Sequence, residues 1–235
     1  MLVVGLPAAA FGTNCWILAP GEGQEGVVVD PGIGVVDPLL DALRDHRVKP
    51  VAVLLTHGHV DHVWSVTPVC GDYGIPAYIH GADRYRLRDP LEMFDPGLLA
   101  AFTAQFGANA WSPPSQVVEL AHDQTVGLAG LQLHVVHAPG HTEGEVMFDL
   151  PAGEYDEPAP LCLSGDVLFA GSIGRTDLPG GDAEAMVHTL RERVLPLADE
   201  TVVLPGHGPR TTIGRERGTN PFLRGLLPAD EETAP

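Results

Sequence analysis

The chain has 235 residues, with 13 Lys and Arg against 31 Asp and Glu, so its formal net charge is −18. Such an acidic surface repels polyanions, which disfavours a nucleic-acid partner. Hydrophobic residues make up 44% of the chain and charged residues 19%, a composition that supports a sizeable core and excludes intrinsic disorder.

The cysteines and the apolar segments indicate the compartment. An odd, sparse set of three cysteines (Cys15, Cys70 and Cys162) is no disulfide framework, so we expect core packing in a reducing, cytoplasmic setting. No Lys or Arg precedes Arg44, so the apolar N-terminus lacks the positive region of a signal peptide. No apolar run approaches the roughly 18 residues of a membrane span, and no membrane partner is expected.

The first third of the chain predicts a β-meander followed by a helix and a buried strand. Short apolar runs broken by Gly and Pro predict strands at Leu2–Leu6, Thr13–Ala19 and Val27–Asp30. Apolar residues at helical spacing predict a helix over Val35–Arg47. Val51–Leu55 is expected to be a buried strand that carries the first histidine cluster at its end.

The middle of the chain is less regular. A strand is expected at Ala77–His80 and a helix at Ala82–Leu87. Residues 90–115 combine four prolines with four aromatic side chains, which indicates short helical pieces in a lid or an insertion. Plain core packing is the alternative interpretation of this segment.

The second half again predicts strands followed by helices. A helix is expected at Asp182–Val194, with Asp182 near its N-terminal cap, and an acidic hairpin loop at Pro151–Pro160. Residues 209–235 are expected to be a polar tail with at most one short helix, beyond a core of about residues 10–210 in a single domain 1–235. Strands are expected at Val117–Leu120, Gln124–Val126, Leu131–His137, Val146–Leu150, Leu161–Ser164 and Thr201–Leu204. Two β-rich halves with helices outside predict sheet packed on sheet between helices.

Histidines and aspartates gather where predicted strands end. Three His and one Asp lie within six residues, in the segment Thr56–His62. His141, Asp166 and His207 follow later strands. Loops at strand ends carry function because a rigid sheet positions them, and imidazole with carboxylate suits Zn, Fe or Mn. Packing does not explain this composition, so the pattern predicts a metal site.

The spacing divides the cluster between two ions. His57 and His59 lie two residues apart and can face one ion, whereas Asp61 and His62 begin the next helix and can face a second. A later Asp can bridge both ions with its two oxygens. Two metals roughly 3.5–4 Å apart share a hydroxide and stabilise a hydrolytic transition state.

The ordered motifs resemble those of the metallo-β-lactamase superfamily. His57-x-His59-x-Asp61-His62 is followed by Pro139-Gly140-His141-Thr142, Gly165-Asp166 and Pro205-Gly206-His207. The resemblance implies an α/β protein with an αββα sandwich, in which two mixed β-sheets are flanked by helices and the metals lie at one edge.

The same resemblance implies the roles of the ligands. His57, His59 and His141 would hold one metal, and Asp61, His62 and His207 a second. Asp166 would bridge the two, and Asp61 and Asp166 would be the catalytic carboxylates. Two divalent ions per chain are implied, with zinc expected first and iron or manganese as alternatives.

Within the superfamily the chain is similar to compact bacterial glyoxalase II-type hydrolases, through Gly165–Phe169, Gly171–Asp177 and Pro205–Gly208. The resemblance implies hydrolysis of S-2-hydroxyacyl-thiol thioesters by a metal-bridging hydroxide. Arg175 stands where longer members carry a Lys that contacts glutathione, so it is expected to bind substrate, with a local Arg175–Asp177 pair as the alternative. Asp177 replaces a Tyr of those members and the long basic C-terminal domain is missing, which leaves the thiol carrier open.

The nearest alternative is a persulfide dioxygenase. These enzymes are similar in fold and in the stretch Gly174–Asp177, and use one iron held at positions matching His57, His141 and Asp166. They place a His-Asp pair near the last ligand, whereas Pro205–Gly208 here favours the hydrolase. Charge argues against a nuclease, seven filled ligand positions argue against a degenerate binding module, and a structural zinc site needs only four ligands. The expected partner is therefore a small acyl-thiol, with the oligomeric state left open.

Overall fold

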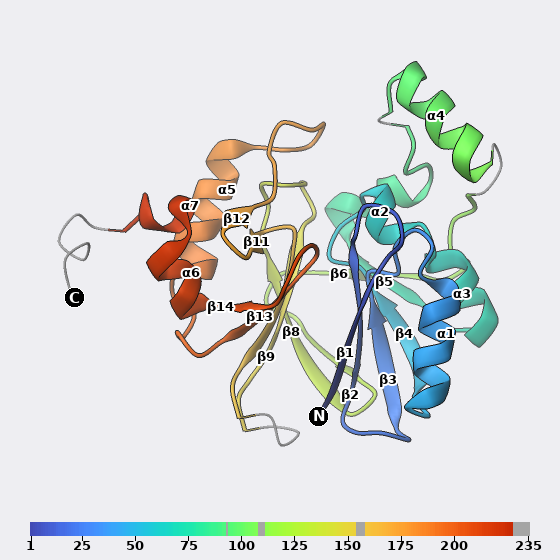
Figure 1. Ribbon diagram of the computed structural model, residues 1–235, viewed down its shortest axis with the longest axis horizontal. Coiled ribbons are helices and arrows are strands. Elements are labelled where there is room, and N and C mark those ends of the chain that lie inside the picture. The colour runs from blue at the N-terminus through green and yellow to red at the C-terminus, as the bar shows by residue number, and fades with distance from the viewer. Residues whose placement is uncertain (93, 108–110, 154–157, 228–235) are drawn as a thin grey trace.

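The computed structural model describes residues 1–92, 94–107, 111–153 and 158–227. Two six-stranded sheets pack face to face, with helices on both outer surfaces (Figure 1). This αββα arrangement confirms the predicted fold class. Within the described ranges, no helix is long and apolar enough to cross a membrane.

The first sheet is mixed and has its strands in sequence order. The first three strands pair antiparallel, as the predicted meander requires, and the remaining pairs are parallel. Its strands are β1 (Leu2–Pro7), β2 (Asn14–Ala19), β3 (Glu25–Val29), β4 (Lys49–Leu54), β5 (Ala77–His80) and β6 (Val117–Leu120).

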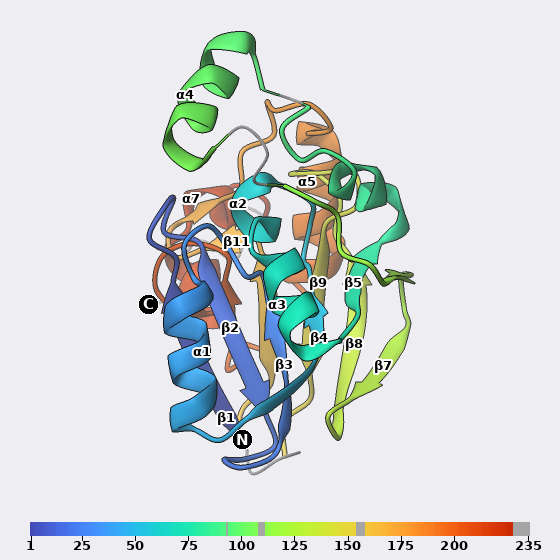
Figure 2. The same cartoon turned by 90° about the vertical axis from the view of Figure 1, so that its right-hand side faces the viewer.

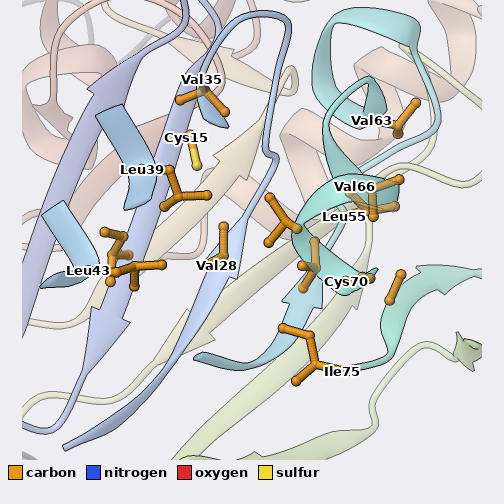
Figure 3. Packing of buried hydrophobic residues seen from close by; sticks show 14 of the residues in the cluster. Cys15, Val28, Val35, Leu39, Leu43, Leu55, Val63, Val66, Cys70 and Ile75 are labelled. Carbon is orange, nitrogen blue, oxygen red and sulfur yellow. The ribbon is translucent and has the colours of Figure 1, made fainter. Parts of the chain in front are cut away.

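Four helical elements follow strands of this sheet, and two of them cover its outer face. The elements are α1 (Val36–Asp45), α2 (Val60–Val63), α3 (Val66–Tyr73) and the 3₁₀ helix Gly81–Leu87. Leu39 and Leu43 of α1 pack with Val66 and Cys70 of α3 on outward-facing strand residues such as Val28 (Figure 3). All three cysteines are buried, which confirms their expected packing role.

The second sheet is also mixed, in the order β14-β13-β10-β9-β8-β7. Only the β10–β13 pair is parallel among its described pairs. Its strands are β7 (Thr125–Leu128), β8 (Leu131–His137), β9 (Val146–Leu150), β10 (Leu161–Gly165), β13 (Val202–Pro205) and β14 (Thr211–Thr212). A small hairpin, β11 (Leu168–Phe169) with β12 (Ser172–Ile173), follows β10.

Helices of the C-terminal half cover the outer face of the second sheet (Figure 1). They are α5 (Ala183–Thr189), which continues as a π-helical turn over Leu190–Val194, α6 (Ile213–Thr219) and α7 (Pro221–Arg224). Between the two sheets, Leu18 and Leu54 of the first pack with Leu133, Phe148 and Leu163 of the second. Alternation along each strand thus supplies an inner face and an outer face.

The expectation of a polar C-terminal tail was wrong. Residues beyond 210 add β14 and two helices to the second layer. Ile213 and Leu223 are buried against α5, and the side chains of Thr212 and Asn220 cap the two helices. Side-chain caps satisfy the free N–H groups of a short helix, so one buried apolar residue in each helix suffices to dock the two helices on the second layer. The core also begins earlier than residue 10, because β1 starts at Leu2.

The excursion at residues 90–115 contains α4 (Pro96–Phe106), which stands outside the sandwich above α2 (Figures 1 and 2). Phe102 is buried there against Trp64, with ring centroids 4.8 Å apart. Phe94, Phe102 and Phe106 join a small cluster with Ile33 and Val60, whereas Trp111 packs on the outer core of the first sheet. The segment is therefore an insertion that also contributes to core packing. Residues 93 and 108–110, and 154–157 of the predicted acidic loop, lie outside the described residues.

Candidate metal centre

The loops at one end of the sandwich bring together all seven residues that the sequence singled out. His57 and His59 follow β4, and Asp61 and His62 lie on α2. The other three follow strands of the second sheet: His141 after β8, Asp166 after β10 and His207 after β13. Within the described residues their ligand atoms form three overlapping groups, each with atoms within 4.8 Å of one another.

Three buried imidazoles converge in the first group. His59 Nδ1 lies 3.1 Å from His57 Nε2 and 2.8 Å from His141 Nε2. His141 Nδ1 is 2.7 Å from the carbonyl oxygen of Arg175, which can only accept, so Nδ1 carries the proton and Nε2 presents a lone pair. Such a convergence of nitrogen atoms fits a bound cation.

Burial also favours the form of these imidazoles that binds metal. Burial, together with the neighbouring histidines, lowers the pKa of His57 well below its usual value. Burial and His141 lower the pKa of His59 to about 3. Burial lowers the pKa of His141 as well, although Asp166 opposes the shift. Neutral imidazole is the ligating form, so these three side chains are ready to coordinate.

The second group combines one carboxylate with two imidazoles. Asp61 Oδ2 lies 3.2 Å from His207 Nε2 and 3.5 Å from His62 Nε2, and the two ring nitrogens are 3.3 Å apart. Thr13 Oγ1 donates to the same Asp61 oxygen at 2.9 Å. Burial alone would raise the pKa of Asp61, but His62 and His207 hold it below its ordinary value, so the side chain is a carboxylate.

Asp166 lies between the two groups. Its Oδ1 is 3.4 Å from His62 Nε2, and its Oδ2 is 3.5 Å from His141 Nε2 and 3.6 Å from His207 Nε2. Oδ1 is buried without a hydrogen-bond partner, as is His59 Nε2. A buried carboxylate oxygen without a donor is costly unless a cation satisfies it. The donor set therefore fits two divalent ions of the kind that accept His and Asp, such as zinc, iron or manganese.

Two buried carboxylates behind the ligands were missed by sequence reasoning. Asp30 Oδ2 lies 3.0 Å from His62 Nδ1 and accepts from Thr56 Oγ1 at 2.7 Å. Glu145 Oε1 accepts from the backbone N–H of Asp166 at 2.9 Å. Its Oε2 lies 3.3 Å from His57 Nδ1 without a hydrogen bond, and that nitrogen lies 3.1 Å from Thr56 Oγ1 instead. Partners of this kind orient metal-binding side chains. The one available signal was that Asp30 ends a predicted strand, as the ligands do.

Asp83 ties the loops of the two sheets together. Its carboxylate is fully buried and accepts from the N–H of Gly58, the hydroxyl of Thr142 and the N–H of Gly144, each at 2.8 Å. The loop that carries His207 is held similarly, because Asn14 Nδ2 donates to the carbonyl oxygens of Pro205 and Gly208. These residues hold the two ligand-bearing halves at the spacing the metals need.

Other histidines lie outside the centre. His46 pairs with Glu22 at the surface, and His134 of β8 pairs with Asp123. The imidazoles of His80 and His137 stack with ring centroids 4.1 Å apart. Within the described residues, none of these four joins a group of metal-ligating atoms.

Arg175 lines the cleft beside the metal centre, but its side chain forms a local pair. Its Nε and Nη2 donate to the two oxygens of Asp177 at 2.7 and 2.8 Å, with both side chains exposed. The alternative that the sequence left open is thus present. The backbone carbonyl of Arg175 orients His141 independently of this pair.

The ligand atoms open into a cleft of about 560 Å³. Its floor contains His59, Asp61, His141, Asp166 and His207, and most of the remaining lining is apolar. This volume is within the usual range for small-molecule sites. The cleft therefore gives a small substrate direct access to both donor groups.

Relatives match nearly the whole chain in sequence. A protein from Mycobacterium leprae is 46% identical over 96% of this chain and 100% of its own length. Hydroxyacylglutathione hydrolase GloC of Haemophilus influenzae is 30% identical over 93% of this chain and 96% of its own. The probable metallo-hydrolase YqgX of Bacillus subtilis is 32% identical, over 94% and 97%.

Solved structures have the same overall fold. The BLEG-1 B3 metallo-beta-lactamase superposes with a TM-score of 0.77 at 34% identity, covering 94% of this chain and 99% of that one. TTHA1623 in a di-iron-bound form gives a TM-score of 0.74 at 36% identity, over 95% and 100%. The family model of the metallo-beta-lactamase superfamily matches residues 8–207, which include all seven ligand candidates. The chain therefore belongs to the metallo-β-lactamase superfamily and has the superfamily's metal-dependent hydrolase architecture.

Proposed function

We propose that this protein hydrolyses thioesters of small acyl-thiols, of the S-2-hydroxyacyl class, with two divalent metal ions. The observation that carries the proposal is the second donor group, Asp61 with His62 and His207, beside the three histidines of the first. Asp166 faces both groups, as a bridging ligand must. A mononuclear iron dioxygenase would need only one of these groups.

The relatives support this assignment of reaction and metal. A homologue over nearly the full length carries the name hydroxyacylglutathione hydrolase. A structural neighbour at 36% identity was solved in a di-iron-bound form, which supports a dinuclear centre and iron as one of the candidate metals. The B3 lactamase neighbour shows that this fold also takes other acyl substrates.

The residues of the chain have separable roles in such a reaction. Bound ions supply the hydroxide nucleophile and polarise the thioester carbonyl. Asp166 would hold both ions, and the cleft would admit the thioester beside the donor groups. Asp30 orients His62, Thr56 contacts Nδ1 of His57, and Glu145 holds the backbone of Asp166. Water adds to the acyl carbon, the C–S bond breaks, and acid and thiol leave. A thiolate departs without a dedicated acid, so no further proton donor is required.

No cysteine competes with this route. Burial raises the pKa of Cys70 to about 12, and burial also raises the pKa of Cys15 and of Cys162. A nucleophilic cysteine needs an accessible thiolate, which burial denies to all three.

Arg175 is proposed to contact an anionic part of the substrate. The support is its position at the cleft and the suitability of guanidinium for carboxylate. Because Arg175 is held by Asp177, an anion must displace that partner or share the guanidinium with it.

The test combines metal analysis with a substrate panel. Protein prepared with zinc, iron or manganese should retain close to two ions per chain. It should hydrolyse lactoyl thioesters of glutathione and of other small thiols, with free thiol released in step with acid. A ratio of one iron per chain under all conditions, with oxygen uptake on a persulfide and no thioester hydrolysis, would establish the dioxygenase instead.

A further inference from the structure

One wall of the cleft is apolar and exposed beside the metal centre. It is built from Phe11 in the β1–β2 loop, Phe94 just before α4, Leu98 in the first turn of α4, and Leu178 in the loop after β12. These segments are remote in sequence and meet only across the opening of the cleft. An apolar surface rimmed by polar groups is typical of a binding site.

Phe11 is both exposed to solvent and in a strained backbone conformation. It is 63% exposed, the largest value among the exposed large hydrophobic residues of the described chain. Its φ of +63° is a left-handed conformation that costs energy for a bulky residue. Neither exposure nor strain stabilises the folded chain, so this residue and its placement are better explained by a ligand.

The opposing part of the wall is held in place relative to the metals. Phe102 of α4 packs on Trp64, directly after α2, and on Phe94, with ring centroids 4.8 and 5.5 Å apart. The preceding helix α2 carries Asp61 and His62. Leu98 remains 48% exposed on the cleft side of this cluster. Figure 2 shows α4 directly above α2, consistent with a wall that is attached to the helix of the metal site.

The charges of the cleft leave this wall without a polar partner. Asp61 and Asp166 belong to the donor groups of the metal centre. Arg175 is the one cationic side chain among the described lining residues, and Asp177 occupies its guanidinium. A group that lies along Phe11, Phe94 and Leu98 therefore contacts apolar side chains.

We propose that the thioester substrate carries an apolar group, aliphatic or aromatic, which is held between Phe11 and the Phe94–Leu98 wall. The reacting carbonyl then lies over the metal centre while the apolar group lies toward α4. This inference rests on the proposed thioester hydrolysis for the reacting group, and it assigns the class of group beside it. Burial of that group removes the exposed faces of Phe11 and Leu98 from water, which is the source of the affinity.

Acyl thioesters of N-acetylcysteamine test the proposal, because this carrier is neutral and small. The metal-loaded enzyme should hydrolyse the hexanoyl ester with a kcat/KM at least about 10-fold above that of the acetyl ester. Phe11→Ala and Leu98→Ala should each reduce the hexanoyl value by about 10-fold, mainly through KM, with a much smaller effect on the acetyl ester. Phe11→Gly should match Phe11→Ala, because Gly removes the ring without the strain. Phe222→Ala removes another exposed phenyl ring, 47% exposed on α7 and outside the cleft lining, and is the matched control.

A binding measurement separates this inference from the hydrolase proposal. Calorimetry should show that the thioether S-hexyl-N-acetylcysteamine binds more tightly than the S-methyl compound, and that Phe11→Ala removes the difference. If the thioethers show this dependence on chain length but no thioester is hydrolysed, the apolar site stands and the proposed thioesterase function is rejected. Hydrolysis that is indifferent to chain length, or equally affected by Phe11→Ala and Phe222→Ala, would overturn the apolar site and leave the thioesterase standing.

Discussion

Asp30 stands directly behind His62, with its Oδ2 3.0 Å from Nδ1 of the imidazole. The same carboxylate accepts from both the N–H and the hydroxyl of Thr56, at 2.8 and 2.7 Å. The pairing places the proton of His62 on Nδ1 and aims Nε2 at the second donor group. Asp30 has a φ of +50°, which is a backbone conformation that Asp and Asn tolerate better than other non-glycine residues.

Asp30→Asn should weaken binding of the second metal ion by about 10- to 100-fold while the fold is retained. Asn tolerates the same backbone conformation, but an amide NH₂ facing His62 Nδ1 sets one donor against another. Competition with a chelator would measure the affinity, and the melting curve would check the fold. Glu22→Gln is the matched control, since Glu22 holds His46 at 3.1 Å on the surface. Equal affinities in the two variants would show that Asp30 does not orient His62.

Asp166→Asn should reduce turnover by several powers of ten, with a modest effect on stability. Asn offers one neutral oxygen where Asp166 presents two anionic ones to the two donor groups. Steady-state kinetics on the best thioester measure the loss, and elemental analysis should show fewer than two ions. Asp123→Asn, at an exposed carboxylate paired with His134, is the comparison. Retention of more than about a tenth of the activity would remove Asp166 from the bridging position.

Arg175→Ala should raise KM about 10-fold for thioesters that carry a carboxylate and leave kcat little changed, if the guanidinium binds ground and transition states alike. Neutral thioesters should be affected less. Because the pair with Asp177 is exposed, its loss should hardly move the melting temperature. Asp177→Asn gives the complementary measurement, since it frees Arg175 and should lower KM for the anionic substrates. Identical changes for charged and neutral substrates would restrict Arg175 to a structural role.

Asp149→Asn should stabilise the protein at neutral pH. Asp149 lies on β9 between His134 and Cys162 of the neighbouring strands, and its buried Oδ1 has no hydrogen-bond partner. Burial raises the pKa of Asp149, although the Cys162 thiol and His134 oppose the shift. The folded state therefore binds this proton more tightly than the unfolded state, and stability falls as pH rises through that window.

Removing the charge should accordingly raise the melting temperature most at neutral pH. The gain should shrink as pH is lowered through the unfolded-state pKa near ~4, because below it the wild-type carboxyl is neutral in both states. A gain of about 1 kcal/mol would appear as roughly 2–4 °C in a protein of this size. Calorimetry across pH measures it, with Asp41→Asn on the exposed face of α1 as control. A lower melting temperature at neutral pH would show that the Asp149 carboxylate is a stabilising partner.

The elements and the ligand set could be derived from the sequence because both are local properties. Alternation and helical spacing within short windows located most strands and helices, and the cluster from His57 to His62 is dense enough to identify by itself. The later ligands were found because each follows a strand. Reliance on local pattern also explains why the tail was misjudged. Residues 211–224 form helices because of two caps and because Ile213 and Leu223 are buried on a layer that is distant in sequence.

Tertiary structure alone decided what surrounds the ligands. Asp30 lies beside His62, 32 residues away in sequence, and Glu145 lies beside His57, 88 residues away. Asp83 joins loops from both sheets, the most distant of its partners being 61 residues away. A lone acidic residue has no periodicity that would reveal such a contact. The placement of Phe11 and Leu98 along the same cleft is equally non-local. Local pattern thus determined which side chains can bind metal, whereas packing of the two sheets determined how those side chains are oriented and what lies beside them.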